Sequence, residues 1–279
     1  MRIAYRNLID ELDVSDITVN SVISNYPILN LFDERLSTKL RSSAVSALTI
    51  TIDTSDFVDE KINTFAILGH NLTSSASIIL DMNIVNSWPG VTSQTIIWNE
   101  DTILKYFPTI DTDADILLCE TGDTLITESG DTIVSEYGYC YFQIRINDSG
   151  NPDGYIEIGR IWLGTYLQVD PSSLLDFTVT YKNDDVVVFG KGRQKFATKG
   201  VTWREFNFSF PESSHTMVSA IKTMYETVGN HGSVIFCNFD DLTDYALVLP
   251  CYCSIDGELA FQHSERMRFK YSLKLLENK

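Results

Sequence analysis

Apolar and polar residues alternate along much of this chain. The most regular run lies near the carboxyl end, where apolar residues stand at every second position: Met267, Phe269, Tyr271, Leu273 and Leu275. Shorter runs of the same period lie at 48–52, 139–146 and 203–210. A period of two places successive side chains on opposite faces of a strand, so each run predicts a strand with one buried face. Many such strands are typical of antiparallel sandwiches and barrels.

One segment has the period of a helix instead. Apolar residues recur at three- and four-residue steps over 214–228. Ser213 or Ser214 can cap the start of a helix there, and Gly229 can adopt the left-handed conformation just past its end. We therefore predict a helix at 214–228 that packs across one face of a carboxyl-terminal sheet. A weaker helical or irregular piece is expected at 30–40.

The length and one hinge signal predict two domains. A chain of 279 residues can form one large domain or two of ordinary size. Pro171 interrupts the segment 168–173 between two strand patterns, because proline cannot donate to a sheet ladder. We therefore expect a β-sandwich over 1–168 and a smaller β-rich docking domain over 172–279 that carries the helix.

A short repeat lies inside the first of these domains. Residues 120–127 and 128–135 match at a period of eight, and each copy joins a Gly-Asp turn to a β-branched run. This pattern predicts a hairpin or a small turn stack, inserted as a projection near 109–137. Two copies are too few for a solenoid.

The net charge of −17 limits the partners of the chain. A surface of this sign repels nucleic acid and anionic membranes. No stretch approaches the ~20 apolar residues of a membrane span, and the start of the chain lacks the apolar run of a signal peptide. We therefore expect no nucleic-acid partner and no membrane insertion.

One basic stretch departs from this acidic background. Lys191, Arg193, Lys195 and Lys199 lie within nine residues of one another. Such a stretch can contact an acidic partner surface, and its plain alternative is a solvated loop.

The cysteines favour a reducing compartment. Their odd number, five, argues against a secreted disulfide framework. Cys251 and Cys253 are too close for a typical zinc or redox pair, and no histidine pair accompanies them. Five reduced thiols in a protein folded in the cytosol are expected.

Candidate metal chemistry is confined to one acidic run. Asp111, Asp113 and Asp115 resemble the opening of a calcium loop, but Ile116 and Gly122 occupy the positions that require glycine and glutamate. Weak calcium binding and an acidic solvated loop are both open interpretations of this run, and no other cofactor is expected.

Candidate catalytic chemistry is absent from the local motifs. The sequence contains no nucleophile elbow, phosphate loop or dinucleotide fingerprint. A glycosidase stays open, because its carboxylate pair is defined by distance in space. We expect no catalytic site and no enzymatic activity.

Two of the four tryptophans are candidates for partner or glycan contacts. Trp162 and Trp203 lie inside strand patterns, where a core position is expected. Trp88 precedes the turn residues Pro89 and Gly90, and it is the tryptophan for which we most expect exposure. Together with Trp98 it can stack on a sugar or anchor a protein interface.

Several strings of the amino-terminal half carry a family resemblance. They are the segments 26–31, 40–42, 65–72 (Phe-Ala-Ile-Leu-Gly-His-Asn-Leu) and 155–164 (Tyr-Ile-Glu-Ile-Gly-Arg-Ile-Trp-Leu-Gly). In this order they resemble structural proteins of tailed bacteriophages that carry a discoidin-like, galactose-binding-like jelly roll. The carboxyl-terminal half, with its strand at 204–210 before a helix and its final strand at 271–277, is similar to β-rich phage tail-tip and minor tail proteins.

This resemblance implies a structural component of a virion, in the tail, tail tip or baseplate. Its partners would be other virion proteins and copies of itself in a symmetric assembly, and it would be assembled in the cytoplasm of the host bacterium. Two alternatives stay open: a carbohydrate-binding adhesion module for a host surface glycan, and a head decoration or neck protein.

Overall fold

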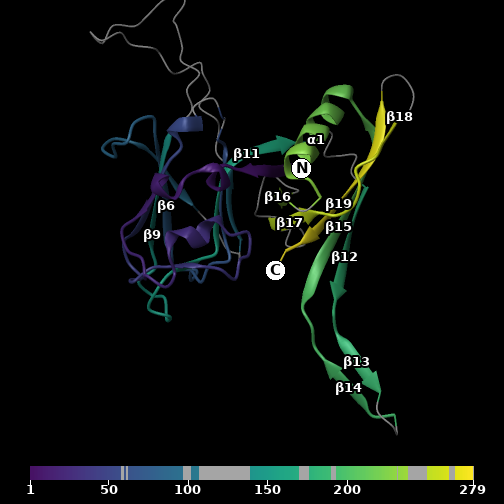
Figure 1. The fold of residues 1–279 in the computed structure, drawn as a ribbon, viewed down its shortest axis with the longest axis horizontal. Coiled ribbons are helices and arrows are strands. Elements are labelled where there is room, and N and C mark those ends of the chain that lie inside the picture. Colours follow the sequence, from purple (N-terminus) through teal and green to yellow (C-terminus); the bar gives the residue numbers. More distant parts are fainter. Residues whose placement is uncertain are drawn as a thin grey trace, which may run out of the picture. The chain divides into compact units, whose positions relative to one another are not determined.

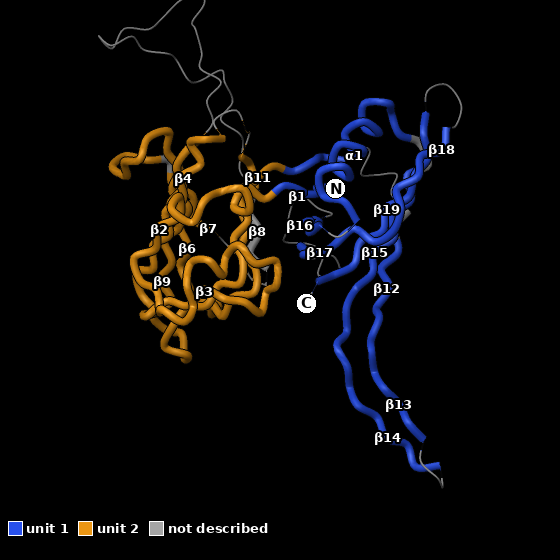
Figure 2. Tube along the Cα trace, viewed as in Figure 1, with its two compact units in different colours: residues 1–6, 166–279 blue, residues 7–165 orange. Residues whose placement is uncertain are grey.

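The computed structural model describes residues 1–57, 60, 62–96, 102–106, 139–169, 176–189, 193–230, 232–237, 250–263 and 268–278. Strands dominate these residues (Figure 1). The chain forms two compact units (Figure 2). We call residues 7–165 the sandwich unit, and residues 1–6 together with 166–279 the arm unit.

The sandwich unit holds two antiparallel sheets. The first contains, in spatial order, β2 (Ile17–Val19), β4 (Leu48–Asp53), β9 (Tyr141–Asn147), β6 (Ser77–Asn83) and β7 (Thr92–Ile96). On the other side, β11 (Arg160–Gln168), whose last three residues belong to the arm unit, pairs with β5 (Thr64–Leu68), and β5 pairs with β8 (Thr102–Tyr106). A short pair joins β3 (Leu40–Arg41) to β10 (Glu157–Ile158). Within the described part of this unit, four 3-10 helices connect these elements: η1 (Leu8–Glu11), η2 (Val14–Asp16), η3 (Ile28–Phe32) and η4 (Ser55–Phe57).

The core of the sandwich unit follows the predicted alternation. Leu48, Ile50 and Ile52 of β4 are fully buried, and the residues between them are partly exposed. Their pairing partners on β9, among them Ile144 and Ile146, are buried as well. The expected mainly β fold with an amino-terminal β-sandwich is therefore confirmed. The weak helical piece expected at 30–40 is irregular apart from the end of η3.

The arm unit is built on one antiparallel sheet. Its spatial order is β12 (Asp176–Asn183), β15 (Thr202–Ser213), β19 (Phe269–Glu277), β17 (Cys251–Ile255), β16 (Ser233–Cys237) and β1 (Arg2–Asn7). The short strand β18 (Phe261–His263) also pairs with β19. Two further strands, β13 (Val186–Phe189) and β14 (Lys195–Thr198), pair only with each other among the described strands.

The predicted helix is confirmed as α1 (His215–Val228), the α-helix of the described residues. The Ser214 hydroxyl accepts a hydrogen bond from the Met217 backbone N–H at 3.2 Å, and Gly229 ends the helix with a φ of 67°. Ile221 and Met224 are buried against the sheet, in a core with Phe206 and Phe208 of β15. The alternation predicted at 203–210 thus supplies the residues that α1 covers.

The boundary between the units differs from the expected one. The expectation gave all of 1–168 to the first domain, but residues 1–6 belong to the arm unit and the second boundary lies between Thr165 and Tyr166. The reason is strand pairing: Ile3 of β1 lies opposite Phe236 of β16 and is fully buried in the arm-unit core. Pairing between distant segments cannot be read from local periodicity.

The four described cysteines, Cys140, Cys237, Cys251 and Cys253, are buried and form no disulfide with one another. Cys119 lies outside the described residues. Within the described part of the chain, no helix is long and apolar enough to cross a membrane.

Candidate interaction surfaces

A two-stranded hairpin extends from the sheet of the arm unit (Figure 1). β12 and β15 pair over eight residues, from Asp176 opposite Ser209 to Asn183 opposite Thr202. Beyond this point β13 and β14 continue the hairpin, with Val186 opposite Thr198 and Phe189 opposite Lys195. We call residues 181–201 the hairpin arm.

Two aspartates form hydrogen bonds across the hairpin between the β12–β15 pair and the β13–β14 pair. The Asp184 carboxylate accepts a hydrogen bond from the Val201 backbone N–H at 2.5 Å, and the Asp185 carboxylate accepts one from the Gly200 N–H at 2.7 Å. The Asp184 N–H also donates to the Val201 carbonyl at 3.4 Å. The carboxylates thus take the place of backbone acceptors where the pairing of the two strands is interrupted. The base of the arm is therefore hydrogen-bonded across both strands.

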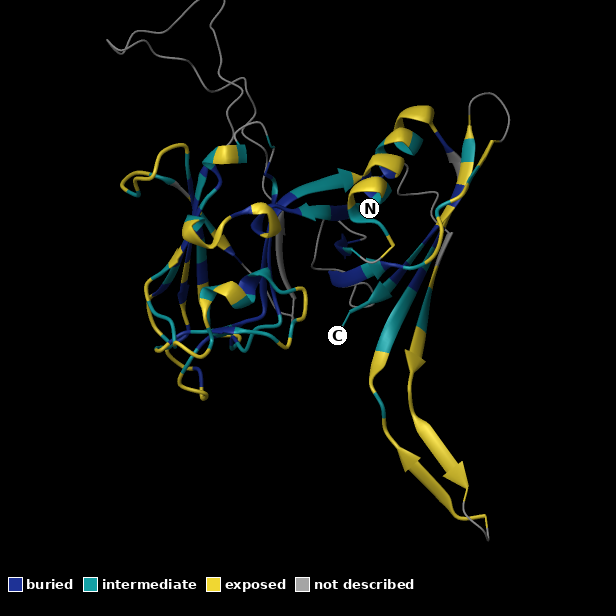
Figure 3. Cartoon of the chain, in the orientation of Figure 1, coloured by how far each residue is buried: buried dark blue, intermediate teal, exposed yellow. Residues whose placement is uncertain are grey.

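The described residues of the arm are exposed, except for the half-buried Gly200 at its base (Figure 3). Every residue of β13 and β14 is exposed, including Phe189 at 67% and Phe196 at 59%. None of the described arm residues joins either hydrophobic core. An isolated two-stranded hairpin is marginally stable in water, and apolar side chains on it gain nothing from solvent. Their exposure marks a surface that a partner can cover.

Both faces of the arm are apolar. Successive side chains of a strand point to opposite faces, and directly paired residues share a face. Val186, Val188 and Phe196 therefore lie on one face, because Val188 pairs with Phe196. Val187 and Phe189 lie on the other. A ribbon of this kind is covered fully only by a groove, or by two surfaces that enclose it.

The arm is also the basic part of an acidic protein. Residues 181–201 contain five Lys and Arg against two Asp, a net charge of +3. The arm unit as a whole has 14 basic and 14 acidic residues and is neutral, whereas the sandwich unit has 7 against 24, a net charge of −17. The entire charge excess therefore lies in the sandwich unit.

A second cluster surrounds Arg41 in the sandwich unit. Its guanidinium carbon lies 3.9 Å from the ring centre of Tyr26 and 4.0 Å from that of Tyr155, so the guanidinium is held between two rings. Glu157 accepts hydrogen bonds from Arg41 Nε at 2.9 Å and from Lys39 Nζ at 3.2 Å. The hydrogen bond to Glu157 raises the pKa of Arg41.

The polar and charged groups of this cluster find their partners within the cluster. Both oxygens of Glu157 and both faces of the Arg41 guanidinium are occupied, and the Glu157 backbone N–H donates to the Asn71 side chain at 2.7 Å. We therefore assign the cluster to fastening β3 against β10.

The turn between β6 and β7 presents the predicted residue Trp88. Trp88 is half-buried, while Ile84 and Val85 before it are 56% and 54% exposed. The Asn83 side chain orders the turn, because it accepts a hydrogen bond from the Ile84 N–H at 2.8 Å and donates to the Ser87 carbonyl. Gly90 follows with a φ of 75°. The turn is thus an ordered apolar tip on the sandwich unit.

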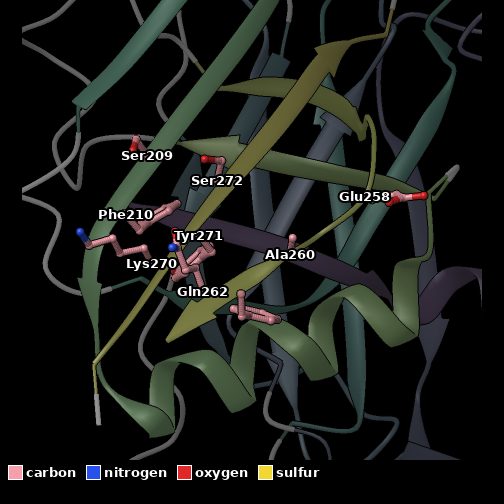
Figure 4. Close-up of a pocket in the computed structure, with 9 residues that line it drawn as sticks. Ser209, Phe210, Glu258, Ala260, Gln262, Lys270, Tyr271 and Ser272 are labelled. Atoms are coloured by element: carbon pink, nitrogen blue, oxygen red, sulfur yellow. The ribbon is translucent and has the colours of Figure 1, made fainter. Parts of the chain in front are cut away.

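An open cleft lies beside β15, β18 and β19 in the arm unit (Figure 4). It has a volume of about 390 Å³ and is lined by Ser209, Phe210, Glu258, Ala260, Phe261, Gln262, Lys270, Tyr271 and Ser272. The rings of Phe210 and Tyr271 stack at 4.3 Å. Burial raises the pKa of Tyr271 to about 12, which the neighbouring Ser213 opposes, so the phenol stays protonated at neutral pH. A ligand in this cleft could pack against side chains and form hydrogen bonds with them. The Tyr271 phenol would not act as a base there.

Several predicted features lie outside the described residues. These are Trp98, the calcium candidates Asp111, Asp113 and Asp115, and the repeat within the expected projection at 109–137. Among the described residues, no three His, Cys, Asp or Glu side chains come together as metal ligands. Trp162 is buried and Trp203 half-buried, in strands β11 and β15.

The basic residues of the arm were evident from the sequence, but the arm itself was not. The signal that was present is the run Val186–Phe189, four apolar residues without alternation, next to the basic stretch. Such a run usually predicts a buried strand. Only the structure shows these residues exposed.

No protein family model matches the chain, and no curated protein matches it. Some solved structures are similar to part of it. CpGH89CBM32-4 of Clostridium perfringens has a TM-score of 0.36 and 10% identity, covering 58% of this chain and all of that one. The family 32 carbohydrate-binding module of NanJ from the same organism, solved with galactose, has a TM-score of 0.33 and 13% identity over 60% of this chain and all of that one.

A Streptococcus pneumoniae fucose-binding module is similar at the same level. It has a TM-score of 0.33 and 10% identity, covering 55% of this chain and 94% of that one. Scores of this size do not transfer a ligand or a site to this chain. The β-sandwich therefore rests on its own strand pairing.

Proposed function

We propose that this chain is a structural subunit that works by assembling with other proteins through its hairpin arm, without catalysis. The exposed apolar surface on both faces of the arm carries the proposal. Covering such a surface stabilises an assembly by roughly 25 cal/mol for each Å² of apolar area removed from water. A soluble monomer gains nothing from this surface, since scattered single apolar residues are normal but a continuous apolar ribbon is not.

The setting that we propose is a bacteriophage virion, in its tail, tail tip or baseplate, assembled in the host cytoplasm. The resemblance of the two halves of the sequence to tail proteins supports this setting. The two-unit organisation also suits it, because one unit can assemble while the other faces outward.

The test is to locate the chain in particles from the native source by cryo-electron microscopy. We expect ordered density at the tail, with the hairpin arm enclosed by neighbouring protein. Absence of the chain from particles would remove the virion setting, and an arm left in solvent within the particle would remove its assembly role.

The ordered turn at 84–90 supports a second candidate function, adhesion to a surface glycan by the sandwich unit. A tryptophan at an exposed turn can stack on a sugar ring, and Ile84 and Val85 widen the apolar tip. A glycan array with the full chain tests it against the Trp88→Ala variant, in the presence and absence of calcium. Signals that vanish in the variant support adhesion at this turn, and a blank array with the native chain excludes it.

A further inference from the structure

We propose that the hairpin arm docks on the sandwich unit of a second copy of this chain. The inference rests on the proposed function and goes beyond it by naming the partner and the receiving surface. The occupant is identified by charge, because the arm carries +3 and the sandwich unit −17, and the described residues of the sandwich unit alone have 13 acidic against 6 basic residues, a net charge of −7.

The basic side chains of the arm are placed for such a contact. Arg193, Lys195 and Lys199 are exposed, and none of them forms an ion pair among the described residues. Their neighbour Lys182 differs, because it pairs with Glu205 of the same unit at 3.5 Å. These three basic side chains along the arm can therefore pair with carboxylates supplied from outside the arm unit.

The apolar residues of the arm determine the shape of the partner surface that can cover them. Val188 and Phe196 on one face and Val187 and Phe189 on the other cannot all be covered by one flat surface. Burial of both faces requires a groove, or a place between two copies. Docking an arm of one unit on a different unit is a head-to-tail contact, which builds a ring or a filament.

The strand edges of the arm add a second kind of contact. In the described structure β13 and β14 pair only with each other, so the outer edge of each strand has unpaired backbone groups. Open edges of this kind pair readily with a strand of another chain. Backbone pairing would set the register, while the basic side chains select an acidic partner.

The first experiment measures the mass of the purified full chain by sedimentation velocity over a range of concentrations. We expect an assembly that weakens at least about tenfold when salt is raised from roughly 0.1 M to 1 M, because screening becomes stronger. A chain that stays monomeric at all concentrations would overturn the inference.

Matched variants then separate the charges from the apolar faces. Lys195→Glu with Lys199→Glu should weaken assembly by about tenfold or more. Lys222→Glu with Arg268→Glu makes the same charge change at exposed sites outside the arm and should leave it within about twofold. Equal effects of the two pairs would show a nonspecific charge effect and contradict docking by the arm.

Each apolar face is tested separately. Val188→Ser with Phe196→Ser, and Val187→Ser with Phe189→Ser, should each weaken assembly by about tenfold or more, because both faces are covered. These residues lie outside both cores, so near-ultraviolet circular dichroism should stay unchanged. If only one pair matters, the enclosed arrangement is wrong.

The receiving surface is identified by zero-length carbodiimide cross-linking in a mixture of ¹⁴N- and ¹⁵N-labelled chains. Mixed-isotope links from Lys195 or Lys199 to carboxylates within 7–165 are expected. Links only to the arm unit, or only within one chain, would overturn the assignment. If the pure chain is monomeric and yet the arm variants are lost from particles, the inference fails while the proposed assembly function stands.

Discussion

The two units differ in how much of their apolar surface is exposed to solvent. The sandwich unit encloses its hydrophobic core between its strands, exposes a short apolar tip at Ile84 and Val85, and carries all of the excess negative charge. The arm unit is neutral, covers its own core with α1, and yet extends a hairpin with two exposed apolar faces. The arm unit therefore exposes a longer run of apolar residues, on two paired strands, than the tip of the sandwich unit does.

This difference separates residues that hold the fold from residues that make contacts. In the arm unit, Phe208 and Phe189 have the same chemistry, but Phe208 is buried with its ring 4.9 Å from that of Phe236 and Phe189 is exposed. The first stabilises the unit and the second can only stabilise an assembly. The predictions below test whether this separation holds.

The largest expected effect is on the arm-unit core. Phe208→Ala should lower the free energy of unfolding of the arm unit by about 3–5 kcal/mol, because it leaves a cavity among packed rings. Phe189→Ala should change it by less than about 0.5 kcal/mol. Hydrogen exchange of β16 and β19 amides in denaturant measures both. A large loss in Phe189→Ala would mean that the arm packs on its own unit.

Each unit has a carboxylate that fastens its strands. Glu277 accepts hydrogen bonds from the Arg204 backbone N–H at 2.7 Å and from its side chain at 2.9 Å, and Glu157 binds Arg41 and Lys39. Glu277→Ala should lower the free energy of unfolding by about 2–4 kcal/mol, because it leaves the half-buried Arg204 without its partner. Glu157→Ala should destabilise the sandwich unit by less, because Arg41 and Lys39 are better solvated.

These losses should be confined to one unit each, arm unit for Glu277→Ala and sandwich unit for Glu157→Ala, in the same hydrogen-exchange experiment. The exposed pair of Lys222 and Glu226 is the control: Glu226→Ala should cost at most about 0.5 kcal/mol. Loss of protection in both units from either variant would show that they unfold together.

A smaller effect is expected at a close approach in the sandwich unit. A Cβ on Gly159 would lie 2.8 Å from the Leu36 carbonyl oxygen and 3.2 Å from that of Leu68. Gly159→Ala should therefore destabilise the sandwich unit by about 1–3 kcal/mol, since backbone atoms must shift. Gly150→Ala, whose Cβ would meet only the Ser75 hydroxyl at 3.3 Å, should cost less. Equal costs would show that residues 36 and 159 separate easily.

The smallest effect is a dependence on pH in the sandwich unit. Burial raises the pKa of Asp10 to about 6, although Arg160 beside it at 2.5 Å acts in the opposite direction. The folded state then binds more protons than the unfolded state between pH 4 and 6, so the contribution of Asp10 to stability falls as pH rises through this range. Unfolding in urea at several pH values should show this fall in the native chain and lose it in Asp10→Asn. An unchanged pH profile in the variant would place the pKa of Asp10 near its ordinary value.

Much of the fold followed from local patterns, and the site did not. The alternation at 48–52 and 203–210, the helix at 214–228 and its cap at Ser214 were all readable, because periodicity and capping act between neighbours in the chain. The arm was readable only as a basic stretch with an apolar run beside it. Whether Val186–Phe189 is buried depends on what packs on it, which no local pattern contains.

By itself, the sequence determined that this protein is mainly β, has a helix at 214–228 and is strongly acidic. These properties follow from side-chain period, capping and charge, which are local or additive along the chain. Only the tertiary structure decided that residues 1–6 complete the arm unit, that all the excess charge lies in the other unit, and that four apolar residues of β13 are exposed. Each of these depends on contacts, made or missing, between segments far apart in the sequence, and such contacts arise only when the whole chain packs.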